Sequence, residues 1–256
     1  MSTAGSTTSA TGRKAATRRA KALTESVNER QARAKEILKR LRRLYPDADC
    51  ALHHGGALEL LVSTILSAQC TDDRVNMVTP ALFQRYRTAA DYAEAKPAEL
   101  ENQIRSTGFF RNKTRNLVGL GRFLAEKFKG QVPDTMDELL ELPGVARKTA
   151  NVILGTWFKK NEGVVVDTHV GRLAHRLKLT WRSRDEKDAV RIEKDLMEIF
   201  PQREWTFVGH ALIWHGRRVC TARKPDCGHC ALADVCPSAF TFDSATKGAK
   251  PKNRAK

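Results

Sequence analysis

Apolar residues recur every three or four positions through most of the chain, a spacing typical of helices that bury one face. In residues 34–46, four aliphatic side chains share one such face, and Pro46 ends the pattern. Residues 57–69 are apolar on nearly every side, which predicts a buried central helix. These patterns predict a mostly helical protein between about residues 25 and 237.

Two further segments have helical spacing. Residues 134–142 place Thr135 and Glu138 three positions apart, the spacing of a capping box. Residues 167–179 repeat apolar side chains at helical intervals. The three valines at 164–166 are the one strand-like run, and they are too few to build a sheet. The expected fold class is therefore all-α.

The charge of the chain favours a polyanionic partner such as nucleic acid. The 256 residues carry a formal net charge of +16. Residues 1–43 hold 12 Lys and Arg against 3 acids, and residues 240–256 hold 5 against 1, which leaves only +3 for the residues between. The net charge therefore supports nucleic-acid binding but does not locate it.

Composition narrows the class of protein. A hydrophobic content of 41% suffices for one large domain or two small ones. No apolar run approaches the ~18 residues of a membrane span, and no secretory signal is visible, so we expect a soluble protein without a membrane partner.

Residues 1–21 contain no acid and no large aliphatic residue after Met1, which favours a disordered tail over a targeting peptide.

Residues 135–150 have the pattern of two helices joined by a tight turn. The first helix ends at Leu142, Pro143–Gly144 turns the chain, and the second helix begins near Arg147. The backbone N–H groups of the turn and of the second helix form a site of the kind that binds phosphate. Pro-Gly turns between helices are common, so the hairpin by itself indicates only a turn.

Lys148 lies in the first turn of this second helix, where the positive end of the macrodipole disfavours an ammonium group. A neutral amine is a nucleophile, so Lys148 is a candidate for Schiff-base chemistry at a sugar C1′. The alternative is a cation that contacts phosphate, as we expect for Arg147. Asp167 precedes an apolar-periodic helix and is either its N-cap alone or also a catalytic carboxylate.

Four of the six cysteines lie within 17 residues, in the spacing C-x6-C-x2-C-x5-C. Four clustered thiolates hold either zinc or a [4Fe–4S] cluster. Structural zinc sites usually take their ligands as two short-spaced pairs, and only Cys227 and Cys230 form such a pair here, which favours iron–sulfur. This clustering also indicates a reducing compartment rather than a secreted disulfide framework. The four cysteines are Cys220, Cys227, Cys230 and Cys236.

Several motifs in order resemble the endonuclease III family of DNA glycosylases. They are the hairpin pattern Leu-Pro-Gly-Val-x-x-x-x-Ala at 142–150, the sequence VDTHV at 166–170 and the cysteine spacing, and the resemblance covers about residues 30–237. It implies a helix-hairpin-helix glycosylase fold with two helical domains, a substrate cleft between them and a C-terminal iron–sulfur loop. The implied domains are 50–160, which ends in the hairpin, and 26–49 with 161–240, between basic tails at 1–25 and 241–256.

The resemblance also implies the reaction. Lys148 would displace an oxidised pyrimidine from the sugar and nick the strand by β-elimination, with Asp167 assisting, so that the protein is both a DNA glycosylase and an AP lyase. A [4Fe–4S] cluster on the four cysteines would have a structural role. The partner would be double-stranded DNA with damaged bases or abasic sites, bound by a monomer in the cytoplasm at the nucleoid, or in the nucleus or mitochondrion of a eukaryote.

The same resemblance implies a set of DNA contacts. Gln69, in LSAQCTD at 66–72, would fill the hole left by an extruded nucleotide, and Phe109 would be an apolar wedge between bases. Phe110 is an equal candidate for the wedge, and either ring would otherwise belong to the core. The remaining contacts are Leu142, Gly144, Ala146, Arg147, Arg223 and Lys224.

Two residues depart from the family pattern. Ala146 stands where the family usually has a second hairpin glycine, so the closest approach of the backbone to phosphate is expected to differ from the family pattern. Phe109 stands where the family often has a leucine, so the contact that probes the lesion is expected to differ as well. Two rival functions remain at this point. One is a mismatch adenine glycosylase, although such enzymes have no nucleophilic lysine at the position of Lys148 and carry a further C-terminal domain. The other is a non-enzymatic DNA-binding or redox-sensing module in which Lys148 contacts phosphate and Asp167 only caps.

Overall fold

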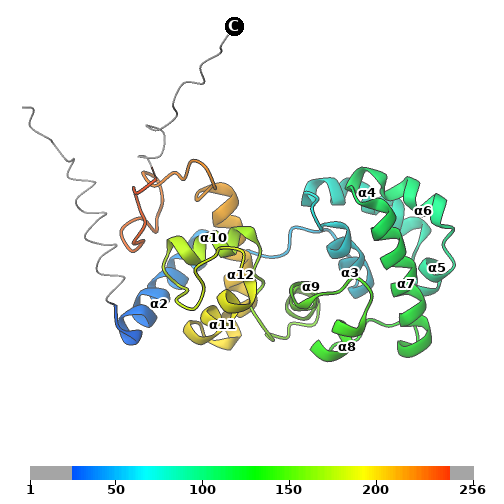
Figure 1. The fold of residues 1–256 in the computed structure, drawn as a ribbon, viewed down its shortest axis with the longest axis horizontal. Helices are drawn as coiled ribbons and strands as arrows, with labels where there is room; N and C mark the ends of the chain where they lie inside the picture. The colour runs from blue at the N-terminus through cyan, green and yellow to red at the C-terminus, as the bar shows by residue number, and fades with distance from the viewer. Residues whose placement is uncertain (1–24, 243–256) are drawn as a thin grey trace, which may run out of the picture. The chain divides into compact units, whose positions relative to one another are not determined.

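The computed structural model describes residues 25–242, and the two predicted tails lie almost entirely outside that range. Between residues 25 and 242 the chain forms helices and no strand, which confirms the all-α class (Figure 1). It divides into two compact units. Residues 49–165 and 202–207 form one, called here the hairpin unit. The other, called the cluster unit, consists of residues 25–48, 166–201 and 208–242 within the described range. The predicted domain bounds stay predictions, because compactness alone does not show that a unit folds independently.

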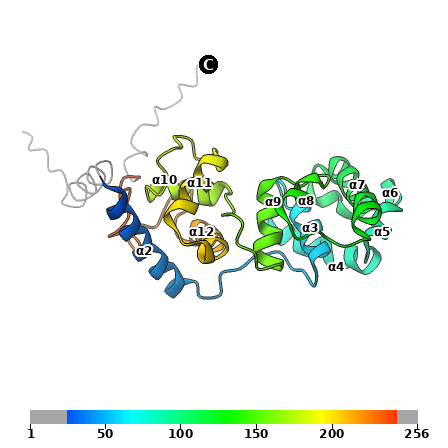
Figure 2. The same cartoon turned by 90° about the horizontal axis from the view of Figure 1, so that it is seen from below.

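In the hairpin unit, α7 packs along α5 and α6, as both cartoon views show (Figures 1 and 2). The predicted buried helix is α3, whose last seven residues are all buried. The bounds are α3 Ala57–Leu66, α4 Asp72–Arg85, α5 Ala89–Ala93, α6 Pro97–Ile104, α7 Phe110–Phe128, α8 Met136–Glu141 and α9 Arg147–Val152, with 3-10 turns at Arg105–Thr107 and Gln202–Glu204 and a π-helical turn at Ile153–Trp157.

The close approach of α5 and α7 depends on a glycine. A Cβ added to Gly121 on α7 would lie 2.5 Å from the backbone nitrogen of Ala93 and 2.6 Å from the carbonyl oxygen of Ala89. Backbone cannot yield as a flexible side chain can, so only glycine allows this packing distance. The contact holds α7 in place, and α7 begins at the loop that contains Phe109.

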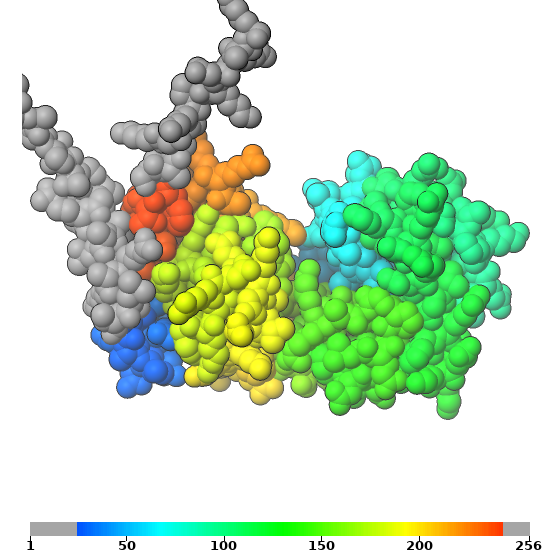
Figure 3. Space-filling view, in the orientation of Figure 1, coloured from blue at the N-terminus to red at the C-terminus, as the bar shows by residue number. Residues whose placement is uncertain are grey.

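The cluster unit is built on α2 (Val27–Leu44), α10 (Thr168–Arg176), α11 (Ala189–Ile199) and most of α12 (Trp205–Arg218), of which residues 205–207 belong to the hairpin unit. The apolar face predicted within 34–46 is buried only in part: Ile37 and Leu41 have no exposed surface, Leu38 is half-buried, and Leu44, at the end of the helix, is 40% exposed. Both α2 and α10 contact α11. Most residues after α12, drawn orange to red, are at least partly exposed (Figure 3), whereas Leu232 and Ala239 are buried.

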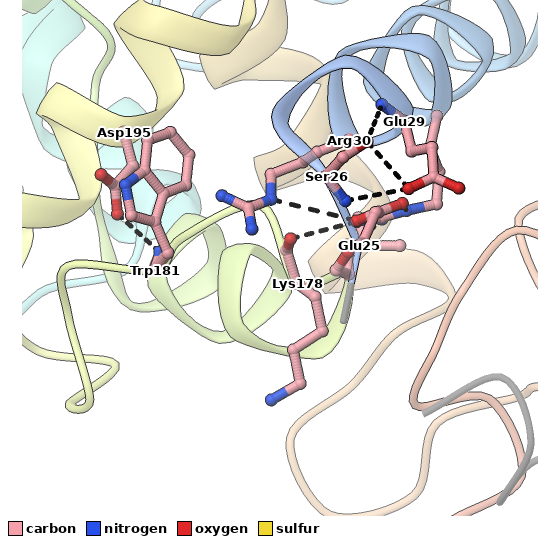
Figure 4. Close-up of polar contacts among 9 residues, drawn as sticks. Glu25, Ser26, Glu29, Arg30, Lys178, Trp181 and Asp195 are labelled. Atoms are coloured by element: carbon pink, nitrogen blue, oxygen red, sulfur yellow. Dashed lines mark hydrogen bonds and ion pairs between the residues drawn. The ribbon is translucent and has the colours of Figure 1, made fainter. Parts of the chain in front are cut away.

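A polar network attaches the start of α2 to the loop before α11 (Figure 4). Ser26 and Glu29 form a capping box at the N-terminus of α2. The Arg30 guanidinium lies 4.6 Å from the centre of the Trp181 ring, and the Trp181 backbone N–H donates to Asp195 at 2.8 Å. Sequence periodicity predicted the helix of α2, but this network depends on residues more than 150 positions apart.

Within residues 25–242, no helix is both long enough and apolar enough to cross a membrane.

Candidate functional site

The hairpin turn has the geometry that its sequence predicts. The Val145 backbone N–H donates to the Leu142 carbonyl oxygen at 3.1 Å, and Gly144 has φ +79°. Proline followed by a residue with positive φ is the signature of a type II turn. A Cβ on Gly144 would also lie 2.8 Å from the side-chain nitrogen of Asn116, so both the backbone angle and the packing require glycine.

The second helix of the hairpin begins at Arg147, as predicted. Ala146 is its N-cap, with extended backbone at φ −107°, an angle that any residue adopts. The missing family glycine therefore causes no backbone strain here. Ala146 has no side-chain oxygen, and the first turn contains no acid, so no side-chain hydrogen bond caps these N–H groups.

Both cations of this first turn are exposed, and so are Gly144 and Ala146. Leu142 differs, since its side chain is only 2% exposed and packs into the core. Its backbone N–H donates to the Leu139 carbonyl oxygen at 3.2 Å and its carbonyl oxygen accepts from Val145, so Leu142 presents neither its side chain nor an unpaired backbone group to DNA. The hairpin presents a strip of backbone N–H groups, the Arg147 guanidinium and the Lys148 amine on one exposed segment.

Asp167 caps α10, the helix that follows the buried valines 164–166. Its Oδ1 accepts hydrogen bonds from the backbone N–H groups of His169 at 2.8 Å and Val170 at 2.9 Å. Capping therefore engages one of the two carboxylate oxygens. Asp167 is half-buried, which is compatible with a second role for its carboxylate. Lys148 belongs to the hairpin unit and Asp167 to the cluster unit.

Gln69 and Phe109 lie in two loops of the hairpin unit and are both exposed. Both have left-handed backbone, with φ of +54° at Gln69 and +49° at Phe109. Phe109 is 61% exposed, so it is not a core residue. Phe110 is half-buried, and the guanidinium groups of Arg105 and Arg111 lie 5.6 and 5.7 Å from its ring centre. The exposure of Phe109 favours that ring as the wedge.

The four clustered cysteines line one pocket in the cluster unit, together with Leu173, His215 and other side chains of α10 and α12. None of them forms a disulfide. In the part of the chain that the structure describes, no three Cys, His, Asp or Glu side chains converge closely enough to hold a single ion. A four-iron cluster holds its ligands farther apart than one ion does, so four thiols around a common pocket fit a cluster.

Burial disfavours the thiolate form of two of the four clustered cysteines. Burial raises the pKa of the Cys230 thiol to about 11 and that of Cys236 to about 12. Buried thiols become thiolates only when nearby positive charge compensates them, and the iron of a cluster supplies that charge. Arg223 and Lys224, in the loop between the first two cysteines, are exposed. His229 is exposed as well and pairs with Asp226 at 3.0 Å.

Two buried arginines of α10 hold the cysteine loop, and sequence reasoning missed both. Arg176 contacts the Cys220 sulfur at 3.2 Å and donates to the Thr221 carbonyl oxygen at 2.8 Å. Arg172 donates to the Cys220 carbonyl oxygen at 3.1 Å and to that of Gly216 at 2.9 Å. The available signal was the placement of two arginines four residues apart in a helix whose apolar positions, Val170, Leu173 and Ala174, predict that it is packed against the core.

His215 is a further residue that the sequence did not single out. It is buried on α12, its Nδ1 lies 2.9 Å from the Tyr45 hydroxyl, and its Nε2 lies 3.4 Å from the Cys230 sulfur. Burial lowers the pKa of His215 to about 4, so its ring is neutral at pH 7. A neutral ring that accepts from Tyr45 at Nδ1 carries its proton on Nε2, facing the sulfur.

Comparison with known proteins matches these features to one family. Residues 62–202 match the model of the HhH-GPD superfamily of base excision DNA repair proteins. Residues 220–236, the segment from the first to the last clustered cysteine, match the iron–sulfur binding domain of endonuclease III.

Relatives from several bacteria are similar over most of their length. Endonuclease III of Synechocystis sp. is 55% identical over 210 residues, which is 82% of this chain and 94% of the relative. Endonuclease III of Bacillus subtilis is 42% identical over 201 residues, covering 78% of this chain and 89% of the relative. A solved structure of a trapped endonuclease III–DNA covalent intermediate is 41% identical, with a TM-score of 0.77, and covers 82% of this chain and 97% of that one.

Proposed function

Because the chain belongs to the endonuclease III family, within the HhH-GPD superfamily of base excision DNA repair proteins, we propose that Lys148 and Asp167 carry out its chemistry. The protein is a DNA glycosylase and abasic-site lyase that acts on damaged pyrimidines, and it holds a [4Fe–4S] cluster. The observation that carries the proposal is the exposed Lys148 amine in the first turn of a helix without a side-chain cap. There the amine is accessible to a sugar while the adjacent N–H groups are accessible to phosphate.

Lys148 is the proposed nucleophile. Its neutral amine attacks C1′ of the damaged nucleotide, and the bond between C1′ and the base nitrogen breaks. The base leaves with the bonding electrons and takes up a proton. The amine nitrogen and C1′ then form an imine as the sugar ring opens. Loss of a C2′ proton and cleavage of the C3′–O bond break the strand on the 3′ side of the lesion.

Asp167 is the proposed partner in this reaction. Its carboxylate would stabilise the positive charge that develops at the sugar as the base departs, and it would accept the proton that the attacking amine loses. The Oδ1 bonds to His169 and Val170 hold the carboxylate in one orientation during both steps. A cap fixed by two backbone donors is a rigid mount for a catalytic group.

The proposed DNA contacts divide into phosphate contacts and probes of the base stack. The N–H groups of the hairpin, with Arg147, would hold phosphates, and the exposed Arg223 and Lys224 would do so from the cysteine loop. Gln69 would occupy the space of the extruded nucleotide, and Phe109 would insert between bases. All four thiolates would hold the cluster, which supplies structural cross-linking of the loop and takes no part in the proposed bond changes.

The nucleophile is tested by borohydride reduction during reaction with a duplex that contains an oxidised pyrimidine. Reduction of the imine links protein and DNA covalently, so we expect wild-type protein to give an adduct and Lys148→Ala to give none. Arg147→Ala is the matched control, since it removes the neighbouring cation but keeps the amine. It should bind DNA more weakly and still be trapped at saturating DNA. An undiminished adduct in Lys148→Ala would exclude Lys148 as the nucleophile.

Asp167→Asn separates capping from catalysis, because asparagine caps helices about as well as aspartate. We expect thermal stability and DNA affinity close to wild type and base excision lower by about 100-fold or more, since a carboxylate that serves as general base is replaced by a neutral amide. Single-turnover excision kinetics and a binding titration on the same duplex provide the measurements. Wild-type excision rates in this variant would reduce Asp167 to a helix cap.

We propose further that the protein acts as a monomer on duplex DNA with damaged bases or abasic sites, and that it resides at the bacterial nucleoid. The bacterial origin of its relatives supports the location, and the basic composition supports DNA association. Sedimentation with and without a lesion duplex tests the stoichiometry: one protein per lesion site is expected, and two would contradict it.

A further inference from the structure

Lys113 on α7 is a buried lysine in the hairpin unit. Its side chain is only 4% exposed, although lysine is among the residues least often buried. The amine donates two hydrogen bonds of 2.8 Å, one to the Leu66 carbonyl oxygen and one to the Thr107 carbonyl oxygen. These two acceptors are 41 positions apart in sequence, so the amine bridges two separate segments of the unit.

Each acceptor lies at the start of a loop with a left-handed residue. Leu66 ends α3, three residues before Gln69, and Thr107 ends a 3-10 turn, two residues before Phe109. Non-glycine residues with positive φ are uncommon, and such strain persists only where surrounding contacts hold it. Lys113 supplies a contact of this kind to both loops at once.

The bridge does not depend on the protonation state of the amine. Burial lowers the pKa of Lys113, but a neutral amine and an ammonium both have the two N–H groups that the carbonyl oxygens require. A hydrocarbon of the same length would leave both buried acceptors unpaired. The amine is thus needed at this position for its hydrogen bonds, whichever charge it carries.

We infer that Lys113 is a positioning residue for lesion recognition, which holds the loops of Gln69 and Phe109 in one fixed arrangement. The inference rests on the probing roles proposed above for those two side chains. With both loops joined to one amine, a displacement of either loop is resisted by the other. Gln69 and Phe109 would therefore be preorganised before the duplex is opened, which lowers the cost of extruding a paired nucleotide.

The test compares two substrates that differ in how much extrusion they need. A paired damaged pyrimidine must be unstacked and unpaired, whereas an abasic site has no base to extrude. For Lys113→Met, we expect kcat/KM on the lesion duplex to fall by about 10- to 100-fold, the scale of loss from a small misplacement. Strand cleavage at a preformed abasic site in the same duplex should change by less than about threefold, because the nucleophile is untouched.

Leu117→Ala is the matched control, because Leu117 is fully buried one turn further along α7. It should lower the melting temperature as much as Lys113→Met or more, while changing activity on the two substrates to the same extent. Equal losses on both substrates in Lys113→Met, or no loss on either, would overturn the inference and leave a merely structural lysine. If Lys113→Met does not fold, Lys113→Gln allows the same comparison of activity on the two substrates, since the shorter glutamine side chain cannot reach both carbonyl oxygens.

Two measurements separate a failure of this inference from a failure of the roles on which it rests. Amide hydrogen exchange in the full-length protein should speed up in residues 67–71 and 108–112 of Lys113→Met and stay unchanged in α5 and α6. Unchanged exchange in both loops would overturn the bridge itself. Gln69→Ala and Phe109→Ala test the probes directly. If both excise like wild type while the loops still loosen in Lys113→Met, the probing roles are wrong and the positioning role fails with them.

Discussion

At the scale of single residues, burial decides how much each charged contact contributes. Arg182 makes two ion pairs, one with Asp195 and one with Glu198. The Asp195 side chain is 0% exposed and also accepts from the Thr180 hydroxyl and from the backbone N–H groups of Trp181 and Arg182, whereas Glu198 is 51% exposed. The same guanidinium therefore makes one structural contact and one that water largely screens.

This contrast makes a prediction about stability. Asp195→Ala should lower the free energy of unfolding by about 2 kcal/mol or more, because four donors lose their acceptor: the Thr180 hydroxyl, the Trp181 and Arg182 backbone N–H groups and the Arg182 guanidinium. Glu198→Ala should change it by less than about 1 kcal/mol, the usual value of an exposed pair. Urea denaturation of the two variants side by side gives both numbers. Similar losses would mean that the donors around Asp195 find other acceptors.

At the scale of elements, the hairpin depends on one glycine and tolerates the loss of another. Gly144 has positive φ and no room for a Cβ, whereas Ala146 has an ordinary extended backbone. The family's second glycine is therefore dispensable for the backbone conformation of this chain. Alanine at position 146 adds a methyl group on the exposed side of the turn, which is the side proposed to face phosphate.

Gly144→Ala should therefore be costly, and Ala146→Gly should not. We expect Gly144→Ala to lose about 1–2 kcal/mol from left-handed strain alone, with additional cost from the contact with Asn116. DNA affinity should fall with it, since the turn would shift its N–H groups. Ala146→Gly should keep stability within about 1 kcal/mol of wild type. Calorimetry and a binding titration on both variants test this, and a neutral Gly144→Ala would contradict the type II geometry.

At the scale of the whole molecule, α10 connects the two functional features of the cluster unit. Asp167 caps its N-terminus, and Arg172 and Arg176 hold the cysteine loop from the same helix. Cluster binding and the placement of Asp167 therefore share one structural element. The hairpin unit has its own core of α3 and α7 side chains and contains none of the four cysteines.

Removal of the cluster should consequently affect the cluster unit first. Amide exchange in α10 and the cysteine loop should rise strongly, while exchange in α3 and α7 stays near its original rate. The four released cysteine thiolates should also take up protons, because a thiol that no longer binds iron has a pKa above 7 even when it is exposed. Hydrogen exchange and proton uptake at weak buffering measure the two effects. Uniform exchange across both units would show that they unfold as one.

Much of this protein follows from local sequence, because periodicity, turn residues and ligand spacing act over short distances. The helices at 57–66 and 136–141, the turn at Pro143–Gly144 and the clustering of four cysteine ligands were all predictable in this way, whereas the choice of iron–sulfur over zinc depended on the family resemblance. The tertiary structure alone decided which polar groups are buried together. Lys113 reaches two loops, Arg176 reaches Cys220, and His215 lies between Tyr45 and Cys230. These contacts join residues distant in sequence, and a buried polar group must take its partner from whatever the packing brings near it.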